Sequence, residues 1–145
     1  MKHINTWQWL GFAGLIPFVV LSLLAFNHSL LSAEHVLLGF ISYSAIILSF
    51  MAGALWGKAV VTVLDDNIAK LLIISNVIAI GCWVALLTPF ELSALILLLS
   101  GYVYLLYVEF RSTQIATTAR YMTLRTVLTS VVAICHVVVM LSLYQ

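Results

Sequence analysis

Charged residues are scarce in this sequence: its 145 residues include six basic and five acidic ones, or 8%. A soluble domain has about 25% charged residues, because charges cover much of a surface that faces water. Apolar residues make up 64% of the chain, and the mean hydropathy is +1.19. The composition therefore excludes a soluble enzyme and a disordered chain, and it indicates an integral membrane protein.

Cysteine is equally scarce, and Cys82 and Cys135 are the only two. Each lies within an apolar run, away from the oxidising compartment that a disulfide needs, so we expect both to be free and buried. The sequence also shows no C-x-x-C pair, H-E-x-x-H motif, Gly-rich phosphate loop or recognisable Ser-His-Asp set. We therefore expect no metal, no cofactor, no catalytic residue and no nucleic-acid partner.

The few charges divide the chain into long charge-free stretches. A helix rises about 1.5 Å per residue, so roughly 20 apolar residues cross a hydrocarbon core of about 30 Å. Apolar runs such as 94–99 do not alternate with polar residues, which excludes a β-barrel. We predict one all-α domain over residues 1–145, a bundle of five transmembrane helices at about 8–26, 36–57, 69–87, 90–109 and 121–143.

The basic residues predict how these helices are oriented. With five spans, all six Lys and Arg fall on the side that holds the N-terminus, residues 58–68 and residues 110–120. The positive-inside rule places that side in the cytoplasm. We therefore expect a bacterial inner-membrane protein with a cytoplasmic N-terminus and a periplasmic C-terminus.

The two prolines each predict a local feature. Pro17 lies in the middle of the first predicted helix, where it removes an N–H donor and favours a kink. Pro89 lies in the sequence Thr88-Pro89-Phe90-Glu91, which has the spacing of a capping box. We expect the fourth helix to begin there after a tight turn and to pack antiparallel to the third.

The second predicted helix carries small side chains at every fourth position: Ala45, Ser49, Gly53 and Gly57. Lipid tails are as apolar as leucine, so helices in a bilayer associate through close van der Waals contact, which small residues permit. This face would pack against another helix of the same chain, or against another protein. Trp56 lies beside it and belongs to an expected belt of aromatic residues at the interface.

A second signal is the charge near the inner ends of the fourth and fifth helices. Arg125 lies a little over one turn into the fifth helix, on the same face as Tyr121, and Glu109 closes the fourth. A charge at this depth is costly unless it pairs or extends to the interface. Glu109 would pair with Arg125 or with Arg120, or else the arginines would form a basic pocket for a lipid headgroup or another anionic ligand.

Among the polar residues predicted within the membrane, His136 of the fifth helix is the most notable. We expect it to donate a hydrogen bond to another helix, and a proton or quinone role is the alternative. A membrane-embedded catalyst that uses His136 or Glu109 is the weakest interpretation, because the sequence shows no recognisable catalytic set.

Three stretches resemble a known family: Leu-Gly-Phe-Ala-Gly-Leu-Ile-Pro-Phe at 10–18, Tyr-Ser-Ala-Ile-Ile-Leu-Ser-Phe at 43–50 with the following Gly53, Trp56 and Gly57, and Tyr-Met-Thr-Leu-Arg at 121–125 followed by Leu128 and Thr129. They are similar to the domain-of-unknown-function family that includes transmembrane protein 69. The resemblance implies a small five-helix protein of bacterial inner membranes, with relatives in mitochondria, and it implies no reaction. The candidate residues for ligand binding or helix packing are Gly14, Pro17, Ser49, Gly53, Trp56, Gly57, Glu109, Tyr121 and Arg125.

These observations favour a non-enzymatic protein of an energy-converting inner membrane. We expect an accessory, assembly or interaction subunit, whose partners are membrane lipids and either a larger complex or a second copy through the second helix. The alternative is a binder or carrier of a lipid or quinone-like amphiphile, in a site between the first, second and fifth helices.

Overall fold

The computed structural model describes residues 6–26, 32–62, 67–112 and 118–144, and these residues fold almost entirely as α-helix. The predicted all-α class is therefore confirmed. In chain order the helices are α1 (Thr6–Ala13), α2 (Ile16–Leu24), α3 (Ala33–Thr62), α4 (Asn67–Leu87), α5 (Glu91–Arg111) and α6 (Ala119–Ser142).

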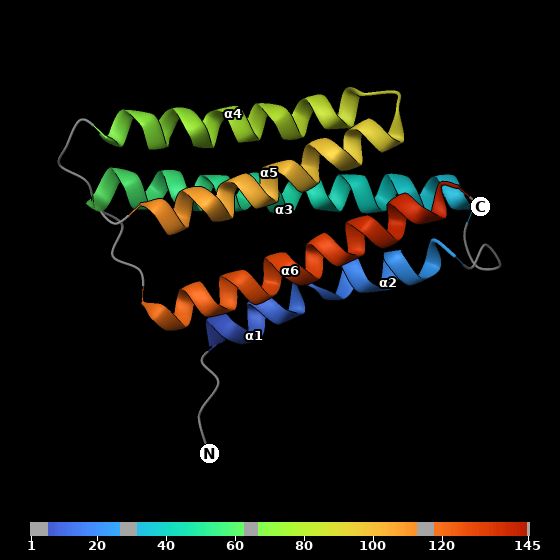
Figure 1. The fold of residues 1–145 in the computed structure, drawn as a ribbon, viewed down its shortest axis with the longest axis horizontal. Coiled ribbons are helices and arrows are strands. Elements are labelled where there is room, and N and C mark those ends of the chain that lie inside the picture. Colours follow the sequence, from blue (N-terminus) through green and yellow to red (C-terminus); the bar gives the residue numbers. More distant parts are fainter. Residues whose placement is uncertain (1–5, 27–31, 63–66, 113–117, 145) are drawn as a thin grey trace, which may run out of the picture.

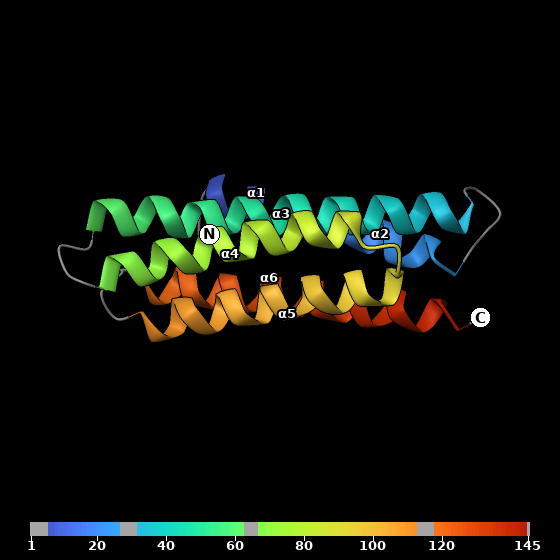
Figure 2. The same cartoon turned by 90° about the horizontal axis from the view of Figure 1, so that it is seen from above.

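The helices run along the long axis of the molecule, and α3 extends over nearly its whole length (Figures 1 and 2). Helix α3 packs against α2, α4 and α5, while α6 packs against α1, α2 and α5. Helices α1 and α2 follow one another along one side of the bundle, next to α6 (Figure 1). The core therefore lies where α2 to α6 face one another, with α3 at its centre.

Four helices of the described chain, α3 to α6, are long and apolar enough to cross a membrane. Their length and composition indicate an integral membrane protein. The first predicted helix, 8–26, differs from this pattern because it is divided into α1, with eight residues, and α2, with nine.

Pro17 explains the division, and the kink predicted at this residue is confirmed. Proline lacks an N–H group, so the carbonyl of Ala13, four residues earlier, loses its helical donor. Helix α1 ends at Ala13, and Pro17 occupies the second position of α2. The Tyr43 hydroxyl of α3 donates a hydrogen bond to the carbonyl of Gly14 at 3.0 Å, so a neighbouring helix supplies a donor at the break.

Helix α3 is longer than predicted, because it continues through Lys58 to Thr62 rather than ending at residue 57. A charge marks the edge of an apolar stretch, and a long lysine side chain near a helix end can carry its ammonium out of the hydrocarbon without ending the helix. The Lys58 ammonium lies over the Tyr121 ring, 3.8 Å from its centroid. Helices α4, α5 and α6 begin and end within one or two residues of their predicted bounds.

The prediction of a capping box at Thr88 is wrong. Helix α5 begins at Glu91, its N-cap is the extended Phe90, and that cap makes no side-chain hydrogen bond. Thr88 instead donates to the carbonyl of Val84 at 2.9 Å, at the end of α4. The turn is nevertheless as short as expected, and α4 and α5 pack against each other as predicted.

A buried polar network joins α3, α5 and α6. The Nδ1–H group of His136 donates to the Val132 carbonyl of its own helix at 2.8 Å. In the neutral ring, Nε2 then accepts from the Ser44 hydroxyl, at 3.0 Å. The Tyr102 hydroxyl donates to the Ser44 carbonyl at 2.9 Å. The predicted interhelical bond of His136 is present, with the ring as acceptor rather than donor because its only N–H bonds within α6.

Cys82 and Cys135 are both free and buried, as predicted. Cys82 of α4 is 2% exposed and belongs to the hydrophobic core, so this cysteine contributes to helix packing.

Candidate functional site

A buried ion pair joins α5 to α6 near one end of the bundle. Arg125 Nε lies 2.6 Å from Glu109 Oε2, and both side chains are about 95% buried, with relative exposures of 5% and 4%. Glu109 lies in the last turn of α5, and Arg125 lies in the second turn of α6, so the short connection between the helices brings them together. Of the two partners that the sequence left open for Glu109, the structure selects Arg125.

Met51, Lys58 and Tyr121 contact this ion pair or one another. We call the five residues the polar cluster: Met51, Lys58, Glu109, Tyr121 and Arg125. The Tyr121 hydroxyl donates to Glu109 Oε1 at 3.4 Å, and the Lys58 ammonium lies over the Tyr121 ring. Arg125 Nη1 contacts Met51 Sδ at 3.1 Å, a sulfur that accepts hydrogen bonds only weakly. The cluster therefore draws its residues from α3, α5 and α6.

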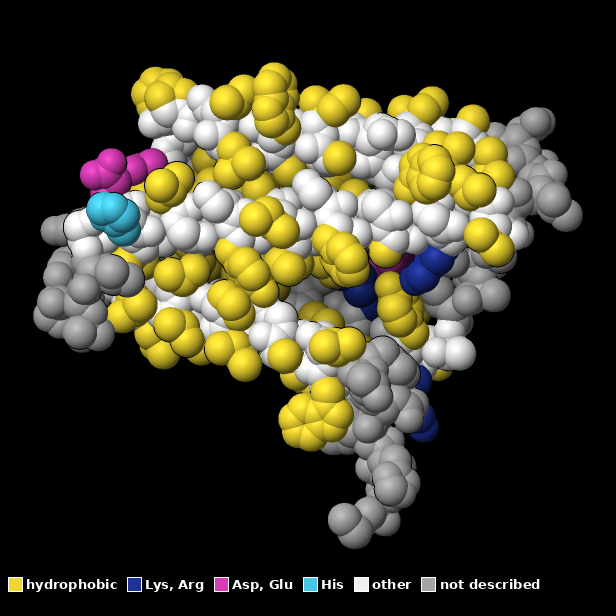
Figure 3. Space-filling view, turned by 180° about the vertical axis from the view of Figure 1, so that it is seen from behind, with side chains coloured by type: hydrophobic (Ala, Val, Ile, Leu, Met, Phe, Trp, Pro, Cys, Tyr) yellow, Lys and Arg dark blue, Asp and Glu magenta, His cyan; other side chains and the backbone are white. Residues whose placement is uncertain are grey.

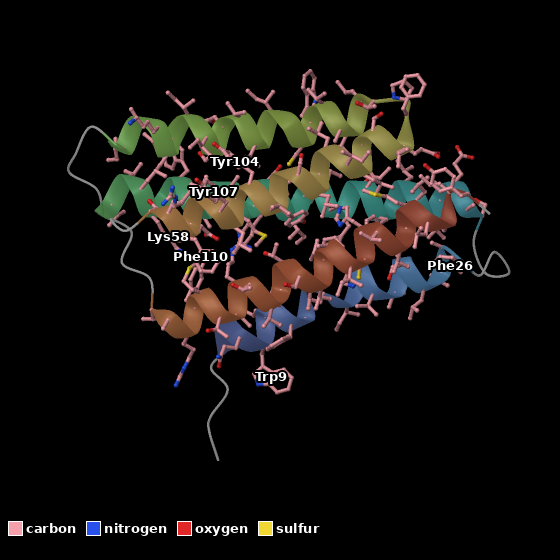
Figure 4. The ribbon with its side chains drawn as sticks, in the orientation of Figure 1. Trp9, Phe26, Lys58, Tyr104, Tyr107 and Phe110 are labelled. Atoms are coloured by element: carbon pink, nitrogen blue, oxygen red, sulfur yellow. The ribbon has the colours of Figure 1, made fainter. Side chains whose placement is uncertain are left out.

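The polar cluster carries a net positive charge, because it holds two cations and one carboxylate. Among the residues that the structure describes, no carboxylate pairs with Lys58. The space-filling view shows basic and acidic atoms together in a recess on a face that is otherwise mainly hydrophobic (Figure 3). Lys58 lies at the same end of the bundle as Tyr107 and Phe110 of α5 (Figure 4).

An apolar cavity of about 160 Å³ adjoins the polar cluster. A cavity of roughly 150 Å³ holds a ligand of the size of benzene, so this one accommodates part of a hydrocarbon chain. Met51 lines the cavity and also contacts Arg125, so the two features share a wall. The lining residues are Leu10, Gly11, Gly14, Leu15, Phe18, Ile47, Phe50, Met51, Tyr102, Leu128, Thr129 and Val132.

Thr129 contributes an unpaired polar atom to this cavity. Its hydroxyl is the one buried side-chain oxygen or nitrogen of the described residues that has no hydrogen-bond partner, and the residue is 4% exposed. Thr123 and Thr126 of the same helix each donate to the carbonyl four residues earlier. An unsatisfied buried hydroxyl costs about 1–3 kcal/mol. A polar atom of a ligand would remove this cost.

The predicted candidates at the first helix lie beside the cavity. Gly14 lines the cavity directly, and its carbonyl accepts a hydrogen bond from the Tyr43 hydroxyl. Pro17 acts on the site indirectly, because it breaks the helix next to Gly14 and Leu15, both of which line the cavity.

The small-residue face of α3 divides into two parts in the structure. Ala45 is 2% exposed and Ser49 is half-buried, so these two lie toward the packed interior. A Cβ atom added at Gly53 or Gly57 would meet nothing within 4 Å. Trp56 is 45% exposed. Gly53, Trp56 and Gly57 therefore lie apart from the cavity and from close helix contacts within the described chain.

The sequence reasoning missed Lys58, Met51 and Thr129 as site residues. Thr129 follows Arg125 by four residues and Tyr121 by eight, so the helical period alone indicated a shared face. Lys58 was interpreted only as a boundary of the apolar stretch. Met51 gave no signal in the sequence, because any apolar residue fits the pattern at its position.

The fold and the site together define a class: a polytopic helical membrane protein with a buried ion pair beside an apolar cavity. The chain belongs to the family described as "Protein of unknown function (DUF3429)", which matches residues 4–141. No curated protein and no solved structure matches the chain. The family description names no activity, so the function is argued from the site.

Proposed function

We propose that this protein is a non-enzymatic membrane protein that binds one hydrocarbon chain of a membrane amphiphile in the cavity lined by α1, α2, α3, α5 and α6. The observation that carries the proposal is the apolar cavity beside the polar cluster. This combination suits a molecule that is apolar over most of its length and polar at one end. A lipid and a quinone with a hydrocarbon tail both have this form.

The apolar part of the molecule would gain only packing energy in the cavity. A chain that leaves the bilayer for the cavity passes from one apolar environment to another, so no hydrophobic driving force is available. It gains van der Waals contacts with the cavity wall, which an empty space denies to the lining residues. The polar end must therefore contribute much of the affinity and all of the orientation.

The topology predicted from the sequence forms part of this proposal. In it α1 and α2 together make a fifth crossing, the N-terminus and the polar cluster face the cytoplasm, and the membrane is the bacterial inner membrane. The kinship with transmembrane protein 69, which the sequence motifs suggest, belongs to the same proposal.

Native mass spectrometry of the full chain, released from lipid nanodiscs, tests the binding. We expect the wild-type protein to retain one amphiphile. Ile47 lines the cavity on α3, so Ile47→Trp should fill the space and lower the retained fraction at least tenfold. Ile46→Trp is the matched control, because Ile46 is 62% exposed on the adjacent position of the same helix.

The proposal is overturned if the wild-type chain retains no amphiphile, or if Ile47→Trp and Ile46→Trp retain it equally well. A thermal unfolding curve for each variant establishes that both are folded.

The second candidate function, an interaction subunit, rests on the open space beside Gly53 and Gly57. Paired glycines four residues apart permit two helices to approach closely in a membrane. A second copy of the chain would fill this space with the same face of its own α3. We expect Gly53→Leu to reduce crosslinked dimers in native membranes, while Gly81→Leu on α4, also in open space, leaves them unchanged. Equal crosslinking in both variants would contradict this role.

A further inference from the structure

We infer that the amphiphile is an anionic phospholipid whose phosphodiester binds Lys58 and Arg125 in the recess of the polar cluster, while one acyl chain enters the apolar cavity. This inference rests on the proposed function and specifies its ligand. It distinguishes a charged lipid from a neutral quinone, which the cavity alone does not.

Charge balance is the first argument. Glu109 neutralises one of the two cations in the polar cluster and leaves one positive charge near the membrane interface. A positive charge near the interface attracts a lipid of net charge minus one, which neutralises it. A neutral quinone would leave the charge as it is.

The donors that remain in the recess are the second argument. Arg125 donates from Nε to Glu109 and from Nη1 to a thioether sulfur, which is a weak acceptor. Its guanidinium therefore has N–H donors that a stronger acceptor could bind. The Lys58 ammonium has three N–H donors, and its described contact is the face of the Tyr121 ring. A phosphodiester has several acceptor oxygens and can bind an arginine and a lysine at once.

The order of residues along α6 is the third argument. Tyr121, Arg125 and Thr129 follow one another at intervals of one helical turn, over about 12 Å. The Tyr121 end meets Lys58, and the Thr129 end opens into the cavity. A phospholipid presents its groups in the same order, with the phosphate first, then the ester oxygens and then the hydrocarbon. Thr129 lines the cavity, and its unpaired hydroxyl would donate to an ester oxygen of the bound lipid.

Competition between two lipids tests the inference. The full chain is placed in nanodiscs of equal parts phosphatidylglycerol, which is anionic, and phosphatidylcholine, which is zwitterionic, and the retained lipid is identified by native mass spectrometry. We expect the wild type to prefer phosphatidylglycerol, and Lys58→Gln to reduce that preference about fivefold, the factor that one basic residue contributes toward an anionic lipid.

Two further variants separate the charge of Lys58 from its effect on folding. Lys58→Arg keeps the charge and should keep the preference. Lys70→Gln is the matched control, since Lys70 is an exposed lysine on α4, and it should behave as the wild type.

The failures of the inference and of the proposed function are distinguishable. If the wild type retains both lipids equally and Ile47→Trp lowers both, the ligand is not selected by charge and the inference alone is wrong. If added ubiquinone displaces phosphatidylglycerol, the ligand is a quinone and the inference is likewise wrong. If inorganic phosphate displaces the lipid, the recess binds a free anion rather than a phospholipid, and the inference is again wrong. If the wild type retains no lipid, both statements are wrong.

Discussion

The ion pair of Glu109 and Arg125 shows how a charge is kept inside an apolar protein. Each side chain alone would be an isolated charge in a medium of low dielectric constant, and the pair removes most of that cost. The geometry is close, at 2.6 Å, and Tyr121 donates to the second carboxylate oxygen. Loss of one partner is therefore more harmful than loss of both.

We expect Glu109→Leu to lower the free energy of unfolding by about 3–5 kcal/mol, because Arg125 is left buried without its counter-ion. The double variant with Arg125→Leu should recover most of that loss. Thermal unfolding in mild detergent measures both. Glu91→Leu is the control, since Glu91 is an exposed carboxylate at the start of the same helix. A single variant that is as stable as this control would contradict the cost assigned to the buried arginine.

Gly101 provides a close contact of a different kind. A Cβ atom at this position of α5 would lie 2.6 Å from Cδ2 of Leu48, which is 2% exposed on α3. The leucine tip is confined by its neighbours and has little room to move away. The glycine therefore sets how closely α3 and α5 approach.

The Gly101→Ala variant should destabilise the protein by about 1–3 kcal/mol, the usual cost of adding volume to a packed core. Leu48→Ala in the same chain should restore part of the stability by making room. Gly53→Ala serves as the comparison and should be neutral, since its Cβ would enter open space. Equal stability of the Gly101 and Gly53 variants, by thermal unfolding, would show that Leu48 adjusts freely.

At the scale of elements, the break between α1 and α2 depends on a neighbouring helix. Pro17 ends the regular hydrogen bonding, and Tyr43 of α3 donates to the carbonyl of Gly14. Helix α1 has eight residues and packs mainly on α6, where Gly11 lies close to Leu128. A short helix of this kind depends on such contacts to hold its position.

Removal of this hydroxyl should loosen α1. We expect Tyr43→Phe to cost about 1 kcal/mol, the usual net contribution of one hydrogen bond. The amides of residues 6–15 should then exchange faster with deuterium, while those of α5 keep their rates. Tyr104→Phe is the control, since Tyr104 is 47% exposed on α5. Unchanged exchange in α1 would mean that its packing on α6 alone holds it.

The elements differ in how well their sequences predict them. Long apolar stretches between charges identified α4, α5 and α6 to within one or two residues, because composition alone determines which segments enter a bilayer. The end of α3 was missed, since the charge of Lys58 ends an apolar stretch without ending hydrogen bonding. The cap of α5 was missed as well, because Thr88 has an alternative acceptor at the end of α4.

The candidate site was predictable only in part. A short connection and the high cost of a buried charge predict that Glu109 pairs with an arginine, but the choice of Arg125 over Arg120 comes from the structure. The cavity does not follow from the sequence, because its walls come from five helices and a void depends on how their side chains meet. The helix contacts that position Met51 and Thr129 are tertiary, so their role appears only in three dimensions.

At the scale of the whole molecule, the asymmetry of charge predicts its orientation. We expect alkaline phosphatase fused after Gln145 to be active and a fluorescent protein fused there to be dark, because the C-terminus is predicted to lie in the periplasm. A fluorescent protein fused within residues 113–117 should be fluorescent and alkaline phosphatase fused there inactive, because that connection is predicted to lie in the cytoplasm. A fluorescent C-terminal fusion would contradict the predicted orientation of the bundle.

The length of α3 has a consequence for the site it helps to form. Its 30 residues make a helix of about 45 Å, which exceeds the roughly 30 Å of a hydrocarbon core. Such a helix adapts by tilting, or the bilayer thickens around it. Met51 of the cavity wall and Lys58 of the recess both lie on α3, so a change in tilt shifts them together relative to α6. The thickness of the surrounding bilayer thereby becomes a variable that sets how well the site holds its ligand.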